Sequence, residues 1–324
     1  MGRFGRVATL QMTETSTKLK FRLVTRSDFD GLVCAMLLRE IDLIDDIAFV
    51  HPKDVQEGRI PLSSGDITAN LPHVAHAHLG FDHHDSEEVR SSKAPNFIND
   101  SKSPSTARVI YRHYGGKERF LGISEEMLAA VDKADSAQFT RDDILWPDGW
   151  VLLSYLMDSR TGLGRFREFP ISNYSFMMSL IAYCRDHSIQ QILRLPDVQE
   201  RVNMYFGHAE KAREQIVRCT RVHKNLAVLD LRQESTIWVT NRFMIYALFP
   251  EINISMHIIW GLNRQNTVFA VGKSVLDRSS HTSAGQLMLR YGGGGHTAAG
   301  TCQIENENAN LVLEQLIARI TADG

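Results

Sequence analysis

Apolar segments of strand length and helix length alternate with polar turns through the first part of the chain. Phe21 to Thr25 has the length of a buried strand, and Leu32 to Ile44 has the length of a helix. Further strands are predicted at Ile47 to Val50 and at Ala75 to Phe81, and a helix over Ser105 to Tyr114 ends at two glycines. Because strands and helices alternate, the pattern predicts an α/β domain built on a parallel sheet.

The pattern changes after Ser124, and the chain stays largely helical as far as about Leu195. Pro196 to Lys224 combines dense charge with one glycine and no internal proline, which predicts one long helix linking two bodies. Beyond it, short strands and helices predict a smaller α+β domain. We expect strands at Ala227–Leu231, Ile237–Thr240, Ile254–Trp260 and Val268–Val271, and helices at Phe243–Phe249, Ser283–Tyr291 and Asn308–Ile320.

These segments divide the chain into four predicted units. They are a flexible tail over 1–19, a first domain over 20–195, a linker helix over 196–224 and a second domain over 225–324. Met12 is an alternative start of translation, so the residues before it are either a tail or an upstream extension.

Composition narrows the class of protein. The chain has 324 residues, 43% apolar and 23% charged, as expected of a two-domain globular protein. With 36 Lys and Arg against 38 Asp and Glu, its net charge of −2 leaves no basic excess to hold a long nucleic acid. No apolar run reaches the roughly 18 residues of a membrane helix, and no signal region opens the chain. Four scattered cysteines without a CxxC pair favour a cytoplasmic location.

The first chemical motif is Asp28-Phe29-Asp30-Gly31, directly after the first predicted strand. Ligands of open α/β sheets bind at the carboxyl ends of the strands, where these two carboxylates lie. Taken alone, the same residues are more often an acidic turn that caps a helix.

A second motif, Asp82-His83-His84, follows another predicted strand. Imidazole nitrogens suit borderline divalent metals and carboxylates suit hard ones, so the mixture indicates a catalytic metal site. For an isolated tripeptide, a solvated strand end is the simpler interpretation.

A third motif consists of four glycines, Gly292 to Gly295, followed by His296. Exposed backbone amides of such a run bind phosphate or another oxyanion. The alternative is a flexible linker, which the apolar helix before the run and the strand after it disfavour.

These three motifs, in this order, resemble the DHH phosphoesterase superfamily, in its two-domain branch with an N-terminal DHH domain and a C-terminal DHHA1 domain. The resemblance covers Phe21 to about Ile320. Within the superfamily, the chain is similar to the exopolyphosphatase-related and oligoribonuclease-like members. It implies a parallel-sheet DHH domain with a helical extension, a long linker helix and a smaller α+β DHHA1 domain.

The resemblance also implies two divalent metal ions. We expect Mn, with Mg or Co as alternatives. Asp66 is preferred over Asp54 for the bridging aspartate, and Asp135 over Asp132 for the last one. The implied ligand set is Asp28, Asp30, Asp66, His83 and Asp135.

One position departs from the family pattern, because most members have a histidine just before the first aspartate. Arg26 stands in that region here, so the first metal position is short of a ligand. Arg26 is expected to bind a substrate phosphate or to weaken that metal by charge repulsion. The nearby histidines His73, His76 and His78 are candidate replacements, although a solvated strand face is the simpler and preferred interpretation.

Further roles are predicted for the remaining polar residues. His84 is expected to stabilise or protonate the leaving oxygen and Asp82 to orient a neighbouring histidine. The predicted phosphate contacts, in a cleft between the two domains, are Arg26, Arg160, Arg278, Gly293, Gly294, Gly295 and His296. For Arg160, a solvated loop over residues 158–165 is an equally good interpretation.

The predicted protein is a phosphoesterase that hydrolyses short oligonucleotides or small nucleotides with a water activated by two metals. An exopolyphosphatase and a non-catalytic nucleotide-binding descendant are the alternatives. We expect no membrane partner and no long duplex, and the oligomeric state is left open, with a homodimer as one option.

Overall fold

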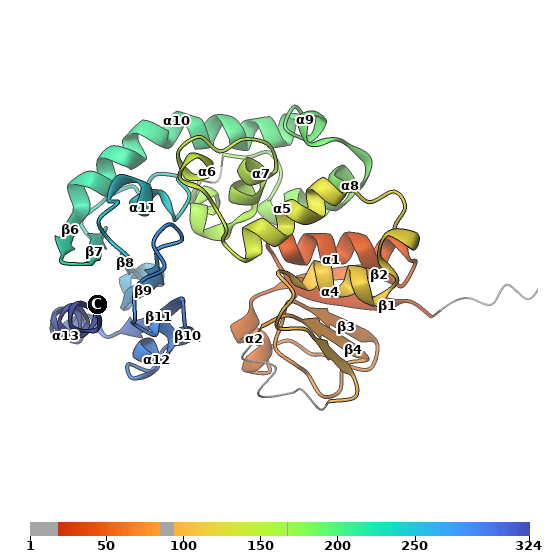
Figure 1. Ribbon diagram of the computed structural model, residues 1–324, viewed down its shortest axis with the longest axis horizontal. Coiled ribbons are helices and arrows are strands. Elements are labelled where there is room, and N and C mark those ends of the chain that lie inside the picture. Colours follow the sequence, from red (N-terminus) through yellow and green to blue (C-terminus); the bar gives the residue numbers. More distant parts are fainter. Residues whose placement is uncertain (1–18, 85–93, 167) are drawn as a thin grey trace, which may run out of the picture.

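The computed structural model describes residues 19–84, 94–166 and 168–324 of the chain. Two bodies are joined by the long helix α10 (Pro196–Cys219), which arches over both of them in Figure 1. The predicted tail therefore lies outside the described residues except for Leu19.

The first body contains a five-stranded sheet in the order β2-β1-β3-β4-β5, with every neighbouring pair parallel. The predicted α/β class is confirmed. In a parallel sheet the carboxyl ends of all strands meet at one edge, so residues that follow different strands come together there. The strands are β1 (Phe21–Arg26), β2 (Ile44–Val50), β3 (Asp66–Ala69), β4 (Leu79–Asp82) and β5 (Phe97–Asn99).

Helix α1 (Phe29–Glu40) is the central helix of this body. Residues 29 to 38 are all buried, because the segment is apolar on nearly every face. It packs against α4 (Thr106–His113), α5 (Glu125–Asp135) and α8 (Asn173–Asp186). A Cβ atom at Gly31 would overlap the carbonyl oxygen of Arg26, so glycine lets the helix begin this close to β1.

The predicted helical extension follows the sheet in sequence and packs on α1 through α5 and α8, so that it lies on the same side of the sheet as α1 in Figure 1. Within the extension, shorter helices connect the longer ones: α6 (Arg141–Leu145), α7 (Gly149–Met157) and α9 (Ile189–Ile192). Another short helix, α2 (Pro52–Gln56), lies between β2 and β3, and Pro52 opens it at the first helical position.

The second body is a six-stranded sheet in the order β10-β11-β9-β8-β7-β6, with its own core around Ile254, Phe269 and Leu316. Its helices are α11 (Met244–Leu248), α12 (Ala284–Leu289) and α13 (Ala309–Asp323). Its strands are β6 (Thr220–His223), β7 (Leu226–Asp230), β8 (Ile254–Trp260), β9 (Thr267–Lys273), β10 (Gly294–His296) and β11 (Ala299–Ile304).

Several predicted elements differ from the structure. The first helix ends at Glu40, and Ile44, predicted as its last residue, begins β2 instead. The segment 237–240 is not a strand, because the backbone N–H groups of Trp238 and Thr240 donate to the Gln215 side chain and to Thr161 instead of to a neighbouring strand. The linker helix ends at Cys219, and the residues after it form β6, where the β-branched Thr220 and Val222 pair with β7.

Among the described residues, every helix is too short or too polar to cross a bilayer.

Candidate active site

Three side chains meet at the carboxyl edge of the parallel sheet. Asp30 lies in the first turn of α1, His83 directly follows β4, and Asp135 is the last residue of α5. One ligand atom from each lies within 4.8 Å of the others, and this is the metal-compatible cluster that the described residues contain. Sequence positions far apart therefore converge where a substrate of an open α/β sheet binds.

Asp30 is a carboxylate held by the start of a neighbouring helix. Its side chain accepts hydrogen bonds from the backbone N–H groups of Thr106 at 3.0 Å and Ala107 at 2.7 Å, in the first turn of α4. Such amides favour a negative charge. Burial and the nearby Asp135 carboxylate nevertheless raise the pKa of Asp30 to about 7. Two carboxylates this close favour a cation between them.

His83 and Asp135 form an ion pair with 2.7 Å between Nε2 and Oδ2. Burial lowers the pKa of His83, but contact with Asp135 outweighs it and raises the pKa to about 10. Burial likewise opposes ionisation of Asp135, yet His83 holds the pKa of that carboxyl below its usual range. In the described structure the imidazolium supplies the positive charge of the cluster.

The donor set fits a divalent ion. The Nδ1 atom of His83 lies 3.1 Å from the carbonyl oxygen of Ser103, which fixes the ring and leaves Nε2 as the ligand atom. Two carboxylates and one imidazole suit Mn, Mg, Co or Zn.

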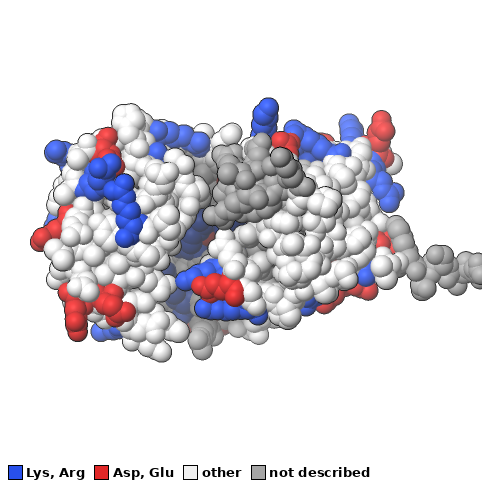
Figure 2. Space-filling view, turned by 90° about the horizontal axis from the view of Figure 1, so that it is seen from below, with Lys and Arg blue, Asp and Glu red and all other residues white. Residues whose placement is uncertain are grey.

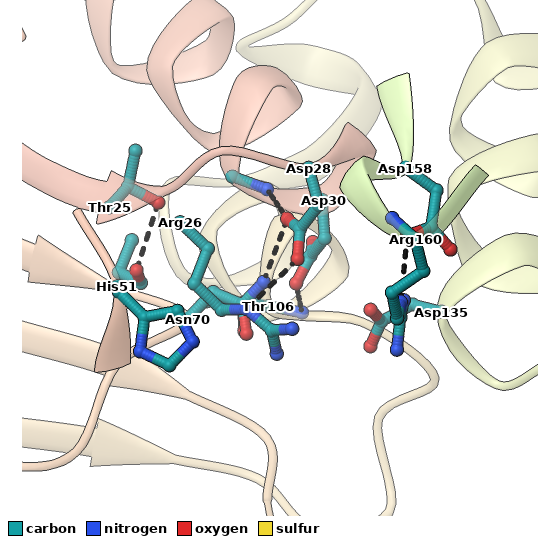
Figure 3. Close-up of polar contacts among 12 residues, drawn as sticks. Thr25, Arg26, Asp28, Asp30, His51, Asn70, Thr106, Asp135, Asp158 and Arg160 are labelled. Carbon is teal, nitrogen blue, oxygen red and sulfur yellow. Dashed lines mark hydrogen bonds and ion pairs between the residues drawn. The ribbon is translucent and has the colours of Figure 1, made fainter. Parts of the chain in front are cut away.

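Asp28 is in a different environment, although it was predicted as a ligand. Its Oδ1 accepts from the backbone N–H of Gly31 at 3.0 Å and from Nδ2 of Asn70 at 3.2 Å. Its Oδ2 lies 3.0 Å from Nε of Arg26. Figure 3 shows Arg26 and Asn70 beside Asp28. The carboxylate caps α1 and is neutralised by the chain's own guanidinium.

The structure does not bring Asp66 to this edge, which corrects its prediction as the bridging ligand. Asp66 begins β3 and pairs with Arg22 of β1 in the register, at the opposite edge of the sheet. Arg22 Nε donates to it at 2.6 Å, and so does the backbone N–H of Ser63 at 2.6 Å. Asp66 is a structural carboxylate that ties two strands together.

Asn70 is the residue that follows β3 at the functional edge, and the sequence analysis missed it. The signal was available, since Asn70 directly follows the apolar residues Ile67 to Ala69. Its side chain is buried, and its Oδ1 has no hydrogen-bond partner among the described residues.

Asp82 and His84 form a second pair beside the cluster. The Asp82 side chain is buried, and its Oδ1 lies 2.7 Å from Nδ1 of His84. Burial lowers the pKa of His84, but Asp82 outweighs it and holds the pKa above its usual range. Asp132, the alternative to Asp135, is instead bound to Arg108 and Ser105.

His296 faces this site from the second body. Its pKa lies below the usual range because of burial and then because of the charges of His84, Arg242, Arg26 and Arg160. Figure 2 shows a groove between the two bodies with basic side chains inside it. The histidine of the glycine-rich motif is therefore close to the charges of the first domain.

The glycine run itself has a packing explanation. A Cβ atom at Gly293 would overlap the carbonyl oxygen of Thr301, and one at Gly295 would overlap that of Ala299. These positions lie in or beside β10, which pairs with β11. Close contact between the backbones of these strands therefore requires glycine at positions 293 and 295. The binding of a phosphate by Gly293, Gly294 and Gly295 stays a prediction.

Arg160 and Arg242 flank one acidic side chain. Arg160 Nε lies 2.7 Å from Asp158, and Arg242 Nε lies 3.5 Å from the same carboxylate. Burial and then the charge of Arg160 lower the pKa of Arg242 to about 10. Arg242 was missed, because nothing in the sequence of its apolar segment marks it as part of the site.

The other predicted residues have structural partners. Arg278 of the second body donates to the carbonyl oxygens of Ser136 and Ala137, just beyond Asp135, and so links the two bodies. His78 stacks on Phe21, and His73 lies 3.1 Å from the Asn96 side chain, so these two are not gathered at the cluster. His76 is exposed in a turn before β4, which begins only at Leu79.

Comparison with known proteins shows the superfamily to which the chain belongs. No family model and no curated protein matches it. Among solved structures, a pGpG-specific phosphodiesterase, PggH, from Vibrio cholerae is 57% identical, with 94% of this chain and 100% of that chain covered and a TM-score of 0.79. RecJ in complex with Mn2+ from Thermus thermophilus is 13% identical, with coverages of 94% and 52% and a TM-score of 0.48. CDC45 from Entamoeba histolytica is 9% identical, with coverages of 94% and 95% and a TM-score of 0.49. On the identity and full coverage of the first of these, this chain belongs to the DHH phosphoesterase superfamily and is a hydrolytic phosphoesterase.

Proposed function

We propose that the protein is a metal-dependent phosphodiesterase of short oligonucleotides, with pGpG, a guanine dinucleotide carrying a 5′ phosphate, as its substrate. The observation that carries the proposal is the cluster of Asp30, His83 and Asp135 at the carboxyl edge of the sheet, opposite His296. The pGpG-specific relative supports the choice of substrate.

Asp30, His83 and Asp135 would hold the divalent ion, and Mn2+ is the ion that we propose for this mixed ligand set. A divalent ion supplies Lewis acidity toward a phosphoryl oxygen and toward water. His83 must give up its proton to become a ligand, so binding of the ion releases protons.

His84 is the proposed proton donor to the leaving oxygen. Asp82 holds its Nδ1 at 2.7 Å, which leaves Nε2 for the substrate. Because Asp82 also holds the pKa of His84 above its usual range, the imidazolium needed by a general acid is populated near neutral pH. Asp82 is therefore proposed as a residue that positions the imidazole ring of His84.

Arg26, Arg160, Arg242 and His296 would bind the phosphate groups. Their charges act on one another across the groove, so a short substrate can reach several of them at once. The chain's net charge of −2 provides no long basic track beyond this groove. We therefore propose that dinucleotides to pentanucleotides are cleaved faster than long strands.

Two further expectations stay proposals. A cytoplasmic location is supported by the four cysteines, which lie within the described residues and are all free. A homodimer remains one option for the oligomeric state.

The test is hydrolysis followed by separation of the products. Protein reloaded with Mn2+ is given pGpG, a pentanucleotide, a long single strand and long-chain polyphosphate at matched bond concentration. We expect mononucleotide from pGpG, at least about tenfold faster than from the long strand, equivalent to roughly 1.4 kcal/mol in transition-state binding. Phosphate released from polyphosphate faster than nucleotide from any oligomer would favour the exopolyphosphatase. No turnover of any substrate would favour the non-catalytic alternative.

A further inference from the structure

The two aspartates of the Asp28-Phe29-Asp30 motif have different hydrogen-bond and ion-pair partners. Asp30 is held by backbone amides and faces two further ligand-type side chains. Asp28 instead meets a positive charge, with Arg26 Nε at 3.0 Å from its Oδ2. One carboxylate is left for a metal, and the other is already paired.

The other oxygen of Asp28 is also occupied. It accepts from the backbone N–H of Gly31 and from the amide of Asn70. The orientation of the Asn70 amide follows from this contact, because the reverse would place its Oδ1 against the carboxylate. A neutral amide at this position adds no negative charge that could attract a second cation.

A further histidine at this edge does not supply the missing ligand. His51 follows β2 and lies near Arg26 in Figure 3. Its Nδ1 accepts from the backbone N–H of Lys53 at 3.2 Å, which makes it the N-cap of α2. Because Nδ1 is an acceptor, the proton of the neutral ring is on Nε2, and that nitrogen is then a donor and not a metal ligand.

We propose that the chain carries one resident divalent ion instead of two, and that the guanidinium of Arg26 takes the place of the second cation. The proposal rests on the proposed function only for the position of the resident ion. It is carried by the contacts around Asp28, none of which involves a substrate.

The physical reason is competition for one carboxylate. An ion bound to Oδ2 of Asp28 would lie within about 5 Å of the guanidinium, given metal–oxygen bonds of roughly 2.1 Å. Two positive centres at that separation repel each other.

Arg26 is also placed to act on the substrate. Its charge contributes to the lowered pKa of Asp135 and of His296, so it lies near both the cluster and the opposite body. Because Nε is engaged with Asp28, the two terminal nitrogens remain, among the described residues, as a fork of donors for a phosphoryl group. A planar donor of this kind binds phosphate without demanding metal coordination.

The experiment counts bound Mn2+ without any substrate. The purified full-length protein is stripped with EDTA, titrated with Mn2+ by calorimetry, and analysed by metal emission and by electron paramagnetic resonance. For the wild type we expect about one Mn2+ per chain with the spectrum of an isolated ion. For the double variant Arg26→His with Asn70→Asp we expect about two per chain and the spectrum of a coupled pair.

Two controls keep the test decisive if the double variant folds poorly. Asp28→Asn preserves the helix cap, because Asn and Asp cap equally well, and it should leave the Mn2+ affinity of the protein within about threefold of the wild type. Arg59→His, at an exposed arginine that also pairs with an aspartate, should leave the count unchanged.

Two Mn2+ per wild-type chain would overturn the proposal, as would a loss of bound Mn2+ in Asp28→Asn. A well-folded double variant that still binds one ion would overturn the role given to Arg26 and Asn70. If the wild type binds one Mn2+ but cleaves no oligonucleotide, the proposed function fails while this inference stands.

Discussion

The Nε2 atom of His83 lies 2.7 Å from Oδ2 of Asp135 and joins the end of β4 to the end of α5. Residues far apart in the sequence thus form the ion pair at the centre of the site, and with Asp30 they form the proposed ligand set. In the described structure the imidazolium occupies the place where a cation is needed.

The variant Asp66→Asn tests whether the Asp66 carboxylate has a structural role or a catalytic role. Asp66 is bound to Arg22 and Ser63 at the far edge of the sheet, so its loss should lower the free energy of unfolding by about 1 to 3 kcal/mol. We expect kcat/KM per folded molecule to stay within about twofold of the wild type, since Asp66 does not reach the cluster. Chemical denaturation and steady-state kinetics measure the two quantities. A kcat near zero in folded Asp66→Asn would restore its role as a ligand.

The metal-free protein should lose stability as pH rises from about 4 to about 7. Asp30 has a pKa of about 7 in the folded chain against 3.8 as its ordinary value, so the folded state binds more protons in this window. The loss is at most about 4 kcal/mol, at 1.36 kcal/mol per pKa unit. Thermal unfolding in EDTA across this range measures it.

Asp30→Asn is the control for that measurement, because it removes the titrating group while keeping a side-chain oxygen for the α4 amides. Its stability should vary less between pH 4 and 7 than that of the wild type. An unchanged slope in the variant would assign the pH dependence to another group.

Asp82→Asn should move the alkaline limb of the rate profile. Asp82 raises the pKa of His84, and a general acid is lost as pH rises through its pKa. The variant should therefore lose kcat at lower pH than the wild type, with KM changed less than kcat. A profile of kcat against pH at saturating Mn2+ and pGpG checks this. If the alkaline limb stays in place, His84 is not the titrating acid.

His296→Ala should reduce the preference for short substrates by about tenfold, through weaker binding of a phosphate remote from the metal. The measurement is the ratio of kcat/KM for pGpG to that for a long single strand, with bound Mn2+ counted in parallel. His281→Ala, at an exposed histidine of the same body, is the matched control. Loss of the bound ion in His296→Ala would show that the residue acts on the metal site instead.

The sequence predicted what depends on local pattern. The turn from β1 into α1 carries Asp28 and Asp30 within one short apolar-polar-apolar unit, so the sequence predicted their position at the carboxyl edge of the sheet. The position of Asp82, His83 and His84 was predictable for the same reason, because they lie at the end of an apolar strand. The chemical roles of these residues stay predictions.

The error at Asp66 has a physical cause. Strand β3 is only four residues long and has a polar residue at each end, Asp66 within it and Asn70 after it. Which end faces the functional edge depends on the parallel register with β1, where Arg22 is opposite Asp66. That register depends on how the strands of the sheet pair, and the sequence of the four residues of β3 does not determine it. Arg242 was missed because its role depends on the packing of the second body against the loop of Asp158.

The most direct test of the account is hydrolysis of pGpG in the presence of Mn2+ by the wild type and by Asp30→Asn, His83→Ala and Asp135→Asn. The account predicts steady release of mononucleotide by the wild type and a loss of at least about 100-fold in each variant, since even outer partners of a metal site cost about 10- to 100-fold. It also predicts loss of bound Mn2+ in each folded variant. Full activity of any one of the three, with its fold intact, would contradict the account.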